Sequence, residues 1–397
     1  MKRPFIIIVT LLLQSSYISA QEAPSSSNTY HLVTESKYVD DGVYLIGAYR
    51  VGNSMFLMNT NNMGTIYGKM KKPMEISSCN TIPETITLSD IDTQTYPLST
   101  LEFEIKRVDD GYHIMQDGKY LCSKTPETMS FEDTYTQSGV WSITDQDTRT
   151  YYRCKISIGK TSYIYFKIPT SATEAYFHVS SSTNPPIAPN LYRKDPTITI
   201  GETGYATYYN GSWDSTLPEG VTAYTLKLTA NGENSSLVQS HKYMSGDKIP
   251  AGCAVLIKGS EPASYTFSLS TPDTPLPTYE NALCGTDSET TITSIDKDFY
   301  ILSLDKNNDI NSIGFYTIND DTDSFTNNPH KAYIPIAKSV GAKRLTFCLD
   351  PTDNDVAGIS RILTNNSKDV ILHDVTGKRN YFQKHRIVIR NGKKYFE

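Results

Sequence analysis

The sequence predicts an all-β protein, and three observations support this fold class. Tyr is very frequent, with 28 residues among 397, and Ser and Thr are also abundant. Strand-forming residues come in runs of four to six, separated by Gly, Pro, Asn and Asp. No stretch after the N-terminal segment shows the 3.6-residue apolar periodicity of an amphipathic helix. A chain of this length can hold two or three domains, each with its own core.

The first twenty residues have the composition of a secretory signal peptide. Lys2 and Arg3 form a charged region, Phe5 to Leu13 an apolar core, and Ile18-Ser-Ala20 a small-residue cleavage site. We expect cleavage before Gln21 and a polar linker over residues 21–29. The apolar core is too short to span a bilayer, and no later stretch is long enough to do so. The expected location is extracellular or on the outer cell surface, with the periplasm as the alternative.

A first all-β domain is predicted over residues 30–195, where a hairpin pattern recurs three times. Each copy has a turn, an aromatic strand, a short polar turn and a second aromatic strand. Three such hairpins can close into a β-trefoil-like barrel, which removes exposed sheet edges. An open barrel or a sandwich is the competing topology, because the copies are unevenly spaced. The copies are Asp40–Ile46 with Asn53–Leu57, Asp109–Ile114 with Gly118–Leu121, and Tyr152–Ile156 with Ser162–Tyr165.

A second domain is predicted over residues 196–350. Pro250 presets φ for a turn that ends at Gly252, and Ala254-Val-Leu-Ile257 is a continuous apolar strand suited to a core with two faces. The wording Gly204-Tyr-Ala-Thr-Tyr-Tyr209 and Ile249-Pro-Ala-Gly-Cys-Ala-Val-Leu-Ile-Lys-Gly259 resembles a β-domain frequent in Bacteroidota surface proteins. The resemblance implies an extracellular, sandwich-like module and implies no chemistry.

The C-terminal residues 356–397 contain apolar runs followed by Gly turns, which predict a short β-hairpin module. This segment resembles the type A C-terminal sorting domains of secreted Bacteroidota proteins, although Arg386 occupies the place of the family's Gly before the last strand. The resemblance implies delivery to the surface by a secretion system. The matching positions are Gly358, Ile359, Gly377, Lys378, Arg379, Asn391, Gly392, Lys393 and Lys394.

The net charge of −6 conceals an asymmetry between the tail and the rest of the chain. Residues 378–397 hold seven Lys/Arg and one acid, and the signal segment holds two further bases, so residues 21–377 retain 28 bases and 42 acids, a net −14. An acidic body argues against nucleic acid as a partner. The basic tail has two interpretations, contact with an anionic surface or secretion component, and a solvated strand face protected from aggregation.

The six cysteines show no metal-finger or CxxC spacing. Export permits disulfides, whereas the apolar context of several cysteines favours buried thiols. We favour thiols, and disulfide formation stays open at this stage. The cysteines are Cys79, Cys122, Cys154, Cys253, Cys284 and Cys348.

No catalytic, cofactor-binding or metal-binding motif is present. HExxH, GxSxG, GxxxxGK[ST] and GxGxxG patterns are absent. Asp305 to Asn311 places oxygen side chains at alternate positions, but Ile310 and Tyr316 stand where an EF-hand needs Gly and Glu. We therefore interpret this segment as a turn, with calcium as the alternative, and predict no enzyme activity and no cofactor.

Aromatic residues are the candidate ligand contacts, because their faces stack on sugar rings. Tyr208, Tyr209 and Trp213, around Asn210-Gly-Ser212, look loop-like and are the preferred set. Other aromatics lie in strand-like runs and are expected in the core; these are Tyr49, Tyr67, Tyr112, Tyr120 and Trp141.

The favoured function is a non-catalytic secreted or surface protein that binds a glycan or a protein. The alternatives are an exported hydrolase that uses acids of the first domain and a structural spacer protein.

Overall fold

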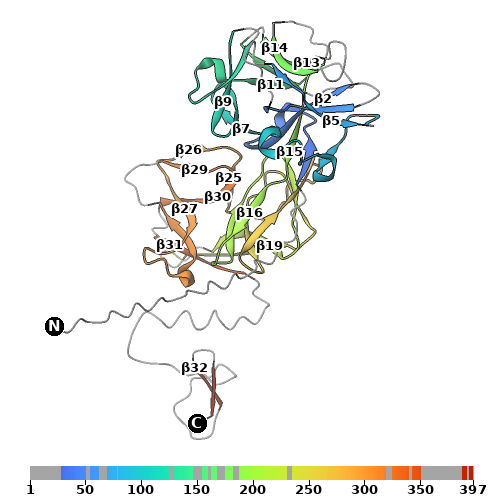
Figure 1. Ribbon diagram of the computed structural model, residues 1–397. Coiled ribbons are helices and arrows are strands. Elements are labelled where there is room, and N and C mark those ends of the chain that lie inside the picture. The colour runs from blue at the N-terminus through green and yellow to red at the C-terminus, as the bar shows by residue number, and fades with distance from the viewer. Residues whose placement is uncertain are drawn as a thin grey trace, which may run out of the picture.

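A computed structural model describes residues 28–349 and two C-terminal strands. Segments left out are 51–53, 62–68, 78, 126–127, 146–153, 160–161, 168–174, 182–186, 230–234, 319–323 and 339–341. Figure 1 shows two domains joined end to end, the first in blue and green and the second in yellow-green and orange. The only α-helix among the described residues is the single turn α1 (Leu98–Leu101). The all-β prediction is confirmed.

The first domain is built from strands β1 to β15. They are β1 (Thr29–Leu32), β2 (Gly42–Arg50), β3 (Ser54–Leu57), β4 (Met70–Lys71), β5 (Met74–Ser77), β6 (Thr85–Thr87), β7 (Glu102–Val108), β8 (Gly111–Gln116), β9 (Lys119–Thr125), β10 (Thr128–Glu132), β11 (Ser142–Asp145), β12 (Cys154–Ile158), β13 (Ser162–Lys167), β14 (Tyr176–Ser180) and β15 (Asn190–Lys194). Single 3₁₀ turns are η1 (Ser36–Tyr38), η2 (Leu88–Asp90) and η3 (Gln137–Gly139).

The second domain holds strands β16 to β31. They are β16 (Thr197–Ile200), β17 (Tyr205–Tyr208), β18 (Asp214–Thr216), β19 (Val221–Thr229), β20 (Ser236–Tyr243), β21 (Lys248–Ile249), β22 (Val255–Gly259), β23 (Ala263–Thr266), β24 (Ser268–Ser270), β25 (Cys284–Thr286), β26 (Thr290–Thr293), β27 (Lys297–Ser303), β28 (Gly314–Thr317), β29 (Ser324–Asn327), β30 (Lys331–Ala337) and β31 (Arg344–Cys348), with the 3₁₀ turn η5 (Ile310–Ser312).

The first domain wraps two sheets around a main core, and a second buried cluster lies on the other face of β2 and β3. The larger sheet runs β10-β9-β8-β7-β2-β15-β1-β6, with β3 on β2 and β5 on β3, and the smaller runs β11-β12-β13-β14-β4. All three predicted hairpins are confirmed, since β2 pairs with β3, β8 with β9 and β12 with β13. Each hairpin sends side chains into the same cluster, for example Phe56, Ile114 and Ile164. The repeat in the sequence therefore reflects three units that share a core.

The main sheet of the second domain curls into a nearly closed barrel. Its order is β17-β22-β19-β20-β31-β28-β27-β30-β25. The first strand returns to the far end of the sheet, because Ala332 N of β30 donates to Thr207 Oγ1 of β17 at 3.1 Å and Tyr209 N donates to His330 O at 3.1 Å. Small sheets, β16-β23 and β21-β18-β24, accompany the main sheet.

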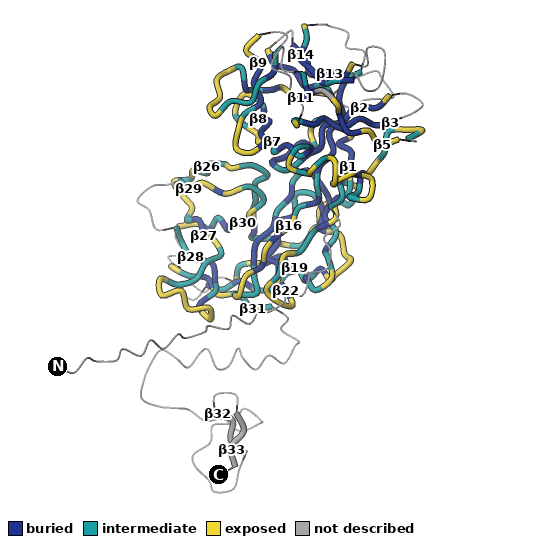
Figure 2. Tube along the Cα trace, in the orientation of Figure 1, coloured by how far each residue is buried: buried dark blue, intermediate teal, exposed yellow. Residues whose placement is uncertain are grey.

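Strand β22 has a core on each face, as its apolar run predicted. Val255 and Ile257 pack in a cluster with Tyr208 and Phe267 on one side of the sheet. Leu256, on the opposite face of the strand, packs in the inner cluster of the barrel. The domain is thus sandwich-like on one side of β22 and barrel-like on the other, and Figure 2 shows buried residues running through the interior of both domains.

Trp213 of the second domain joins the core of the first. Its side chain is 1 % exposed and belongs to the first-domain core cluster, together with Leu269. The indole Nε1 donates to Tyr38 O at 2.9 Å. Asn210 positions the loop, because its Oδ1 accepts the N–H groups of Ser212 and Trp213 at 2.9 and 2.8 Å. The contact between the domains is therefore a packed core and not a flexible link.

A buried ion pair lies beside this junction. Arg193 Nε is 2.6 Å from Asp40 Oδ1, and the two side chains are 4 % and 0 % exposed. Tyr44 also donates to Asp40 Oδ1, at 2.7 Å. The predicted turn residue Gly42 leaves room for the guanidinium, since a Cβ at that position would lie 2.1 Å from Arg193 Cζ. The Asp40-Asp-Gly42 motif thus shapes the junction between the domains, and Gly42 begins β2.

The C-terminal hairpin is present as β32 (Ile387–Arg390) paired with β33 (Lys393–Phe396). Among the sorting-like positions, Lys393 and Lys394 lie on β33. The remaining ones, Gly358, Ile359, Gly377, Lys378, Arg379, Asn391 and Gly392, lie outside the described residues, as do the signal segment and residues 21–27. In the described part of the chain, no helix has the length and hydropathy needed to cross a membrane.

Candidate functional site

A groove opens at one end of the second-domain barrel, over three adjacent strands. In the pairing of β19 with its neighbours, Thr222 lies opposite Lys258 of β22, and Tyr224 lies opposite Lys242 of β20. Alternate residues of a strand share a face, so these four side chains lie on the face that also carries the inner core. Tyr224 belongs to that core and is 2 % exposed. The groove is therefore the mouth of the barrel.

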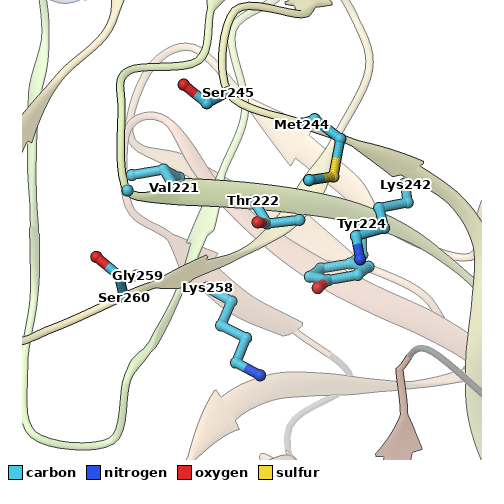
Figure 3. Close-up of a pocket in the computed structure, with 10 residues that line it drawn as sticks. Val221, Thr222, Tyr224, Lys242, Met244, Ser245, Lys258, Gly259 and Ser260 are labelled. Carbon is cyan, nitrogen blue, oxygen red and sulfur yellow. The ribbon is translucent and has the colours of Figure 1, made fainter. Parts of the chain in front are cut away.

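The groove has a volume of about 390 Å³ and is widely open to solvent. Figure 3 shows Thr222 in its centre, between Lys258 on one side and Tyr224 with Lys242 on the other. The lining residues are Gly220, Val221, Thr222, Tyr224, Lys242, Met244, Ser245, Lys258, Gly259 and Ser260. Most of its accessible lining is apolar, and its polar members are hydroxyl groups and the two ammonium groups of Lys242 and Lys258.

Lys242 and Lys258 are the charged side chains among the described residues that line the groove. Lys258 is exposed and Lys242 is half-buried. Their Nζ atoms lie 6.0 Å from the ring centroid of Tyr205 and 5.8 Å from that of Tyr224, which is the outer limit of a cation–π contact. Both ammonium groups thus lie on the face of the sheet that carries the groove. Among the described residues that line the groove, none carries a carboxylate, imidazole or thiol.

The structure places two of the three preferred ligand aromatics in the core. Tyr208 and Trp213 are 0 % and 1 % exposed, so neither offers a ring face to a ligand. Their loop-like context reflects a packed corner at the domain junction. Tyr209 is half-buried, and its ring lies against the backbone at Gly285, where a Cβ would be 2.2 Å from Tyr209 Cγ. Close packing on one face thus limits Tyr209 as well.

The five aromatics in strand-like runs also differ in how far they are buried. Tyr49, Tyr112 and Trp141 are buried, as their strand context predicted, and Tyr67 lies outside the described residues. Tyr120 is half-buried on β9. Among the described members of this set of five, Tyr120 is the one that keeps access to solvent.

The adjacent acids Asp40 and Asp41 are the first-domain carboxylates nearest to His330, at the junction. His330 Nε2 lies 2.7 Å from Asp41 O and its Nδ1 lies 3.1 Å from Tyr209 O. Its Nε2 also lies 3.4 Å from Asp40 Oδ2. Asp287, in the second domain, accepts from Gly211 N at 2.6 Å and Ser212 Oγ at 3.1 Å. His330 therefore links the second domain to Asp40 and Asp41 of the first.

Burial and charge act on these acids in opposite directions. Burial alone would raise the pKa of Asp40, but the charges of Arg193 and His330 outweigh it and hold this pKa below its usual value. Burial raises the pKa of Asp41 to about 6, against the N–H of Arg107. Burial also raises the pKa of Asp287. Asp41 is therefore a junction residue whose charge changes in mildly acidic solution.

Replacing Asp41 with Asn should change how stability depends on pH. The native pKa is above the unfolded value of about 3.9, so the contribution of Asp41 is fully favourable below pH 4 and is lost as pH rises towards 6. Asn has no charge and can still accept from Arg107 N. We expect D41N to exceed the parent protein in free energy of unfolding by about 1–3 kcal/mol at pH 7.5 and to match it near pH 4. Urea denaturation at pH 4 and at pH 7.5 measures these free energies of unfolding, with D133N as an exposed control. The same difference between D41N and the parent protein at both pH values would contradict the prediction.

The structure also describes the calcium-loop candidate at residues 305–311 and the six cysteines. Asp305 Oδ1 accepts the N–H groups of Asn307 and Asp309 at 3.1 and 3.0 Å, which is a turn closed by its own side chain. Among the described residues, no group of three or more His, Cys, Asp or Glu is arranged to hold a metal. All six cysteines are free thiols; Cys122, Cys154 and Cys253 are buried, Cys79 is half-buried, and Cys284 and Cys348 are exposed.

Sequence reasoning missed Lys242 and Lys258, because each is a single lysine in a strand with no motif around it. The available signal was the alternation Thr222-x-Tyr224, which places polar groups on the face that should point into a core. Comparisons with protein-family models, with curated proteins and with solved structures found no match for this chain.

Proposed function

We propose that this chain is an exported, non-catalytic binding protein that holds an acidic glycan in the groove at the mouth of its second-domain barrel. The observation that carries the proposal is the pair of lysines with hydroxyl-bearing neighbours and no acid in the lining. Ammonium groups attract carboxylate or sulfate groups, and hydroxyl side chains exchange hydrogen bonds with sugar hydroxyls. The signal-like segment and the sorting-like tail support an extracellular place of action.

The cationic groove contrasts with the acidic body of the protein. Residues 21–377 carry a net charge of −14, so a polyanion is repelled by most of the surface. Attraction at the groove acts only over about one Debye length, close to 8 Å at physiological salt. A ligand with single acidic groups along a polar chain is repelled little by the acidic surface and can still be attracted at short range by the groove. An extended polyanion such as nucleic acid is repelled by most of that surface.

Removing both groove charges should weaken binding of acidic glycans. We expect K242Q/K258Q to lower affinity for a sparsely charged glycan such as glucuronoxylan, measured by calorimetry, about five- to thirtyfold, since each solvent-exposed charge contact is worth roughly 0.5–1 kcal/mol. K227Q is the matched control, because Lys227 is exposed on β19, the strand between those of Lys242 and Lys258, and is not among the groove-lining residues. Equal binding of the acidic glycan by K242Q/K258Q and the parent protein would show the proposal to be wrong.

A further inference from the structure

Three aromatic rings gather on the surface of the first domain, away from the groove. His113 lies on β8, Tyr120 on the neighbouring strand β9, and Tyr135 in the loop before η3. We call these residues the aromatic triad. The ring centroid of His113 lies 4.0 Å from that of Tyr135 and 5.0 Å from that of Tyr120, and the two tyrosine rings are 5.0 Å apart. Each ring thus contacts both of the others.

The triad combines an exposed ring with a buried, unsatisfied polar atom. Tyr135 is 50 % exposed, and no other Tyr, Phe or Trp in the described part of the chain is exposed to this degree. His113 beneath it is 5 % exposed, and its Nε2 has no hydrogen-bond partner. Burial lowers the pKa of His113, and the charge of Lys106 lowers it further. The imidazole is therefore neutral at physiological pH and has an unused nitrogen, a feature that native proteins seldom leave without a role.

The surroundings of the triad are polar and balanced in charge. Tyr135 lies within Asp133-Thr-Tyr-Thr-Gln137, in which every residue is exposed. Two ion pairs flank the rings, Lys119 with Asp133 at 3.4 Å and Lys124 with Glu132 at 2.9 Å. Each pair cancels its own charge, so the triad offers a ring face and hydrogen-bonding groups with no net local charge.

We propose that the aromatic triad is a second ligand site, which takes the ring of a neutral sugar in an oligosaccharide or polysaccharide. The C–H face of a pyranose packs on the exposed ring of Tyr135, and the side chains of residues 133–137 exchange hydrogen bonds with its hydroxyls. This site is independent of the groove and differs from it in ligand chemistry, since the groove is cationic and the triad is neutral.

A glycan fits this surface better than a protein partner does. Protein hot spots are well-packed pockets ringed by contacts that exclude water. The triad stands instead among solvated charged and hydroxyl side chains, and one tyrosine ring provides most of its accessible apolar area. Such an arrangement matches the amphipathic surface of a sugar, which has one apolar face and a polar rim.

Affinity electrophoresis of the full-length protein tests the proposal. Native gels would contain one neutral polysaccharide each, from a panel of mannan, xyloglucan, galactomannan, soluble starch and hydroxyethyl cellulose. We expect at least one of them to retard the parent protein. Y135A should lose about tenfold in affinity because the stacking face is removed, and Y135F should retain binding because the ring remains. T93A, at an exposed position of the same domain outside the proposed site, is the control for nonspecific effects of a surface substitution, and K242Q/K258Q should be retarded like the parent protein.

Three outcomes would overturn the proposal. The first is that no neutral polysaccharide of the panel retards the parent protein. The second is that Y135A and the parent protein are retarded equally. The third is that the triad binds a protein in a Tyr135-dependent manner while binding no glycan of the panel. Because the groove variant is scored against acidic glycans, failure at the triad is distinguishable from failure at the groove.

Discussion

Replacing Arg193 with Met should lower the free energy of unfolding by about 3–5 kcal/mol, since it leaves the fully buried Asp40 carboxylate without the guanidinium that pairs with it. Asp40 is 0 % exposed, and Arg193 contacts it through Nε at 2.6 Å and Nη2 at 3.3 Å. The same guanidinium also donates to Asp41 O at 3.0 Å and Lys194 O at 2.7 Å. Loss of the cation thus removes four hydrogen bonds and exposes Asp40 to a low-dielectric environment.

The effect of R193M should depend on the charge of Asp40. The double variant D40N/R193M removes both charges, and we expect it to recover most of the lost stability, because isolated charge and not lost packing dominates the penalty. K194M is the matched control: Lys194 pairs with Glu102 at 2.8 Å, but both side chains are about one-fifth exposed, so its loss should cost about 0–1 kcal/mol. Urea denaturation of the four proteins gives the values. A double variant no more stable than R193M would contradict the electrostatic explanation.

Replacing Trp213 with Ala should also cost about 3–5 kcal/mol, and it should separate the unfolding of the two domains. The indole fills the core shared across the junction and donates to Tyr38 O at 2.9 Å. With this side chain present, we expect a single unfolding transition, because neither domain can expose the junction alone. In W213A we expect two transitions in calorimetry, together with faster proteolysis between β15 and β16.

Two controls separate the role of the junction from a general loss of core. W213F keeps an aromatic ring but loses the indole N–H, so it should cost about 1 kcal/mol and retain one transition. Trp141 is 0 % exposed inside the first domain, and W141A should destabilise that domain without removing the junction contact. Trp141 and Trp213 are the only tryptophans, so the fluorescence of W141F reports the junction directly. A single transition in W213A at the stability of the parent protein would contradict the coupling.

Local patterns allowed much of the fold to be predicted. The three hairpins of the first domain follow from Gly turns between aromatic runs, and the C-terminal hairpin follows from the Asn391-Gly392 turn. The two-faced packing of Ala254 to Ile257 follows from a run without polar alternation. These features depend on residues that are neighbours in the chain, which is why sequence reasoning reaches them.

The candidate sites depended on residues that are distant in the chain. Trp213 looked like a loop aromatic because nothing near it shows that another domain covers it. The two lysines of the groove come from β20 and β22, and they meet only because β19 lies between these strands. In the triad, Tyr120 was considered as a strand aromatic, but His113 and Tyr135 were not, since only the pairing of β8 with β9 and the return of the following loop bring the three rings together.

The sequence by itself determined the all-β class, the hairpins and the strand with two buried faces, because alternation and turn chemistry are properties of a few consecutive residues. Only the tertiary structure decided which side chains are covered and which converge. Asp40 and Arg193 are 153 positions apart and form one buried pair. Trp213 lies beyond the C-terminal end of the first domain in the sequence, yet it is buried in the core of that domain. Burial and long-range pairing are set by how sheets curl and pack, and no local pattern encodes that geometry.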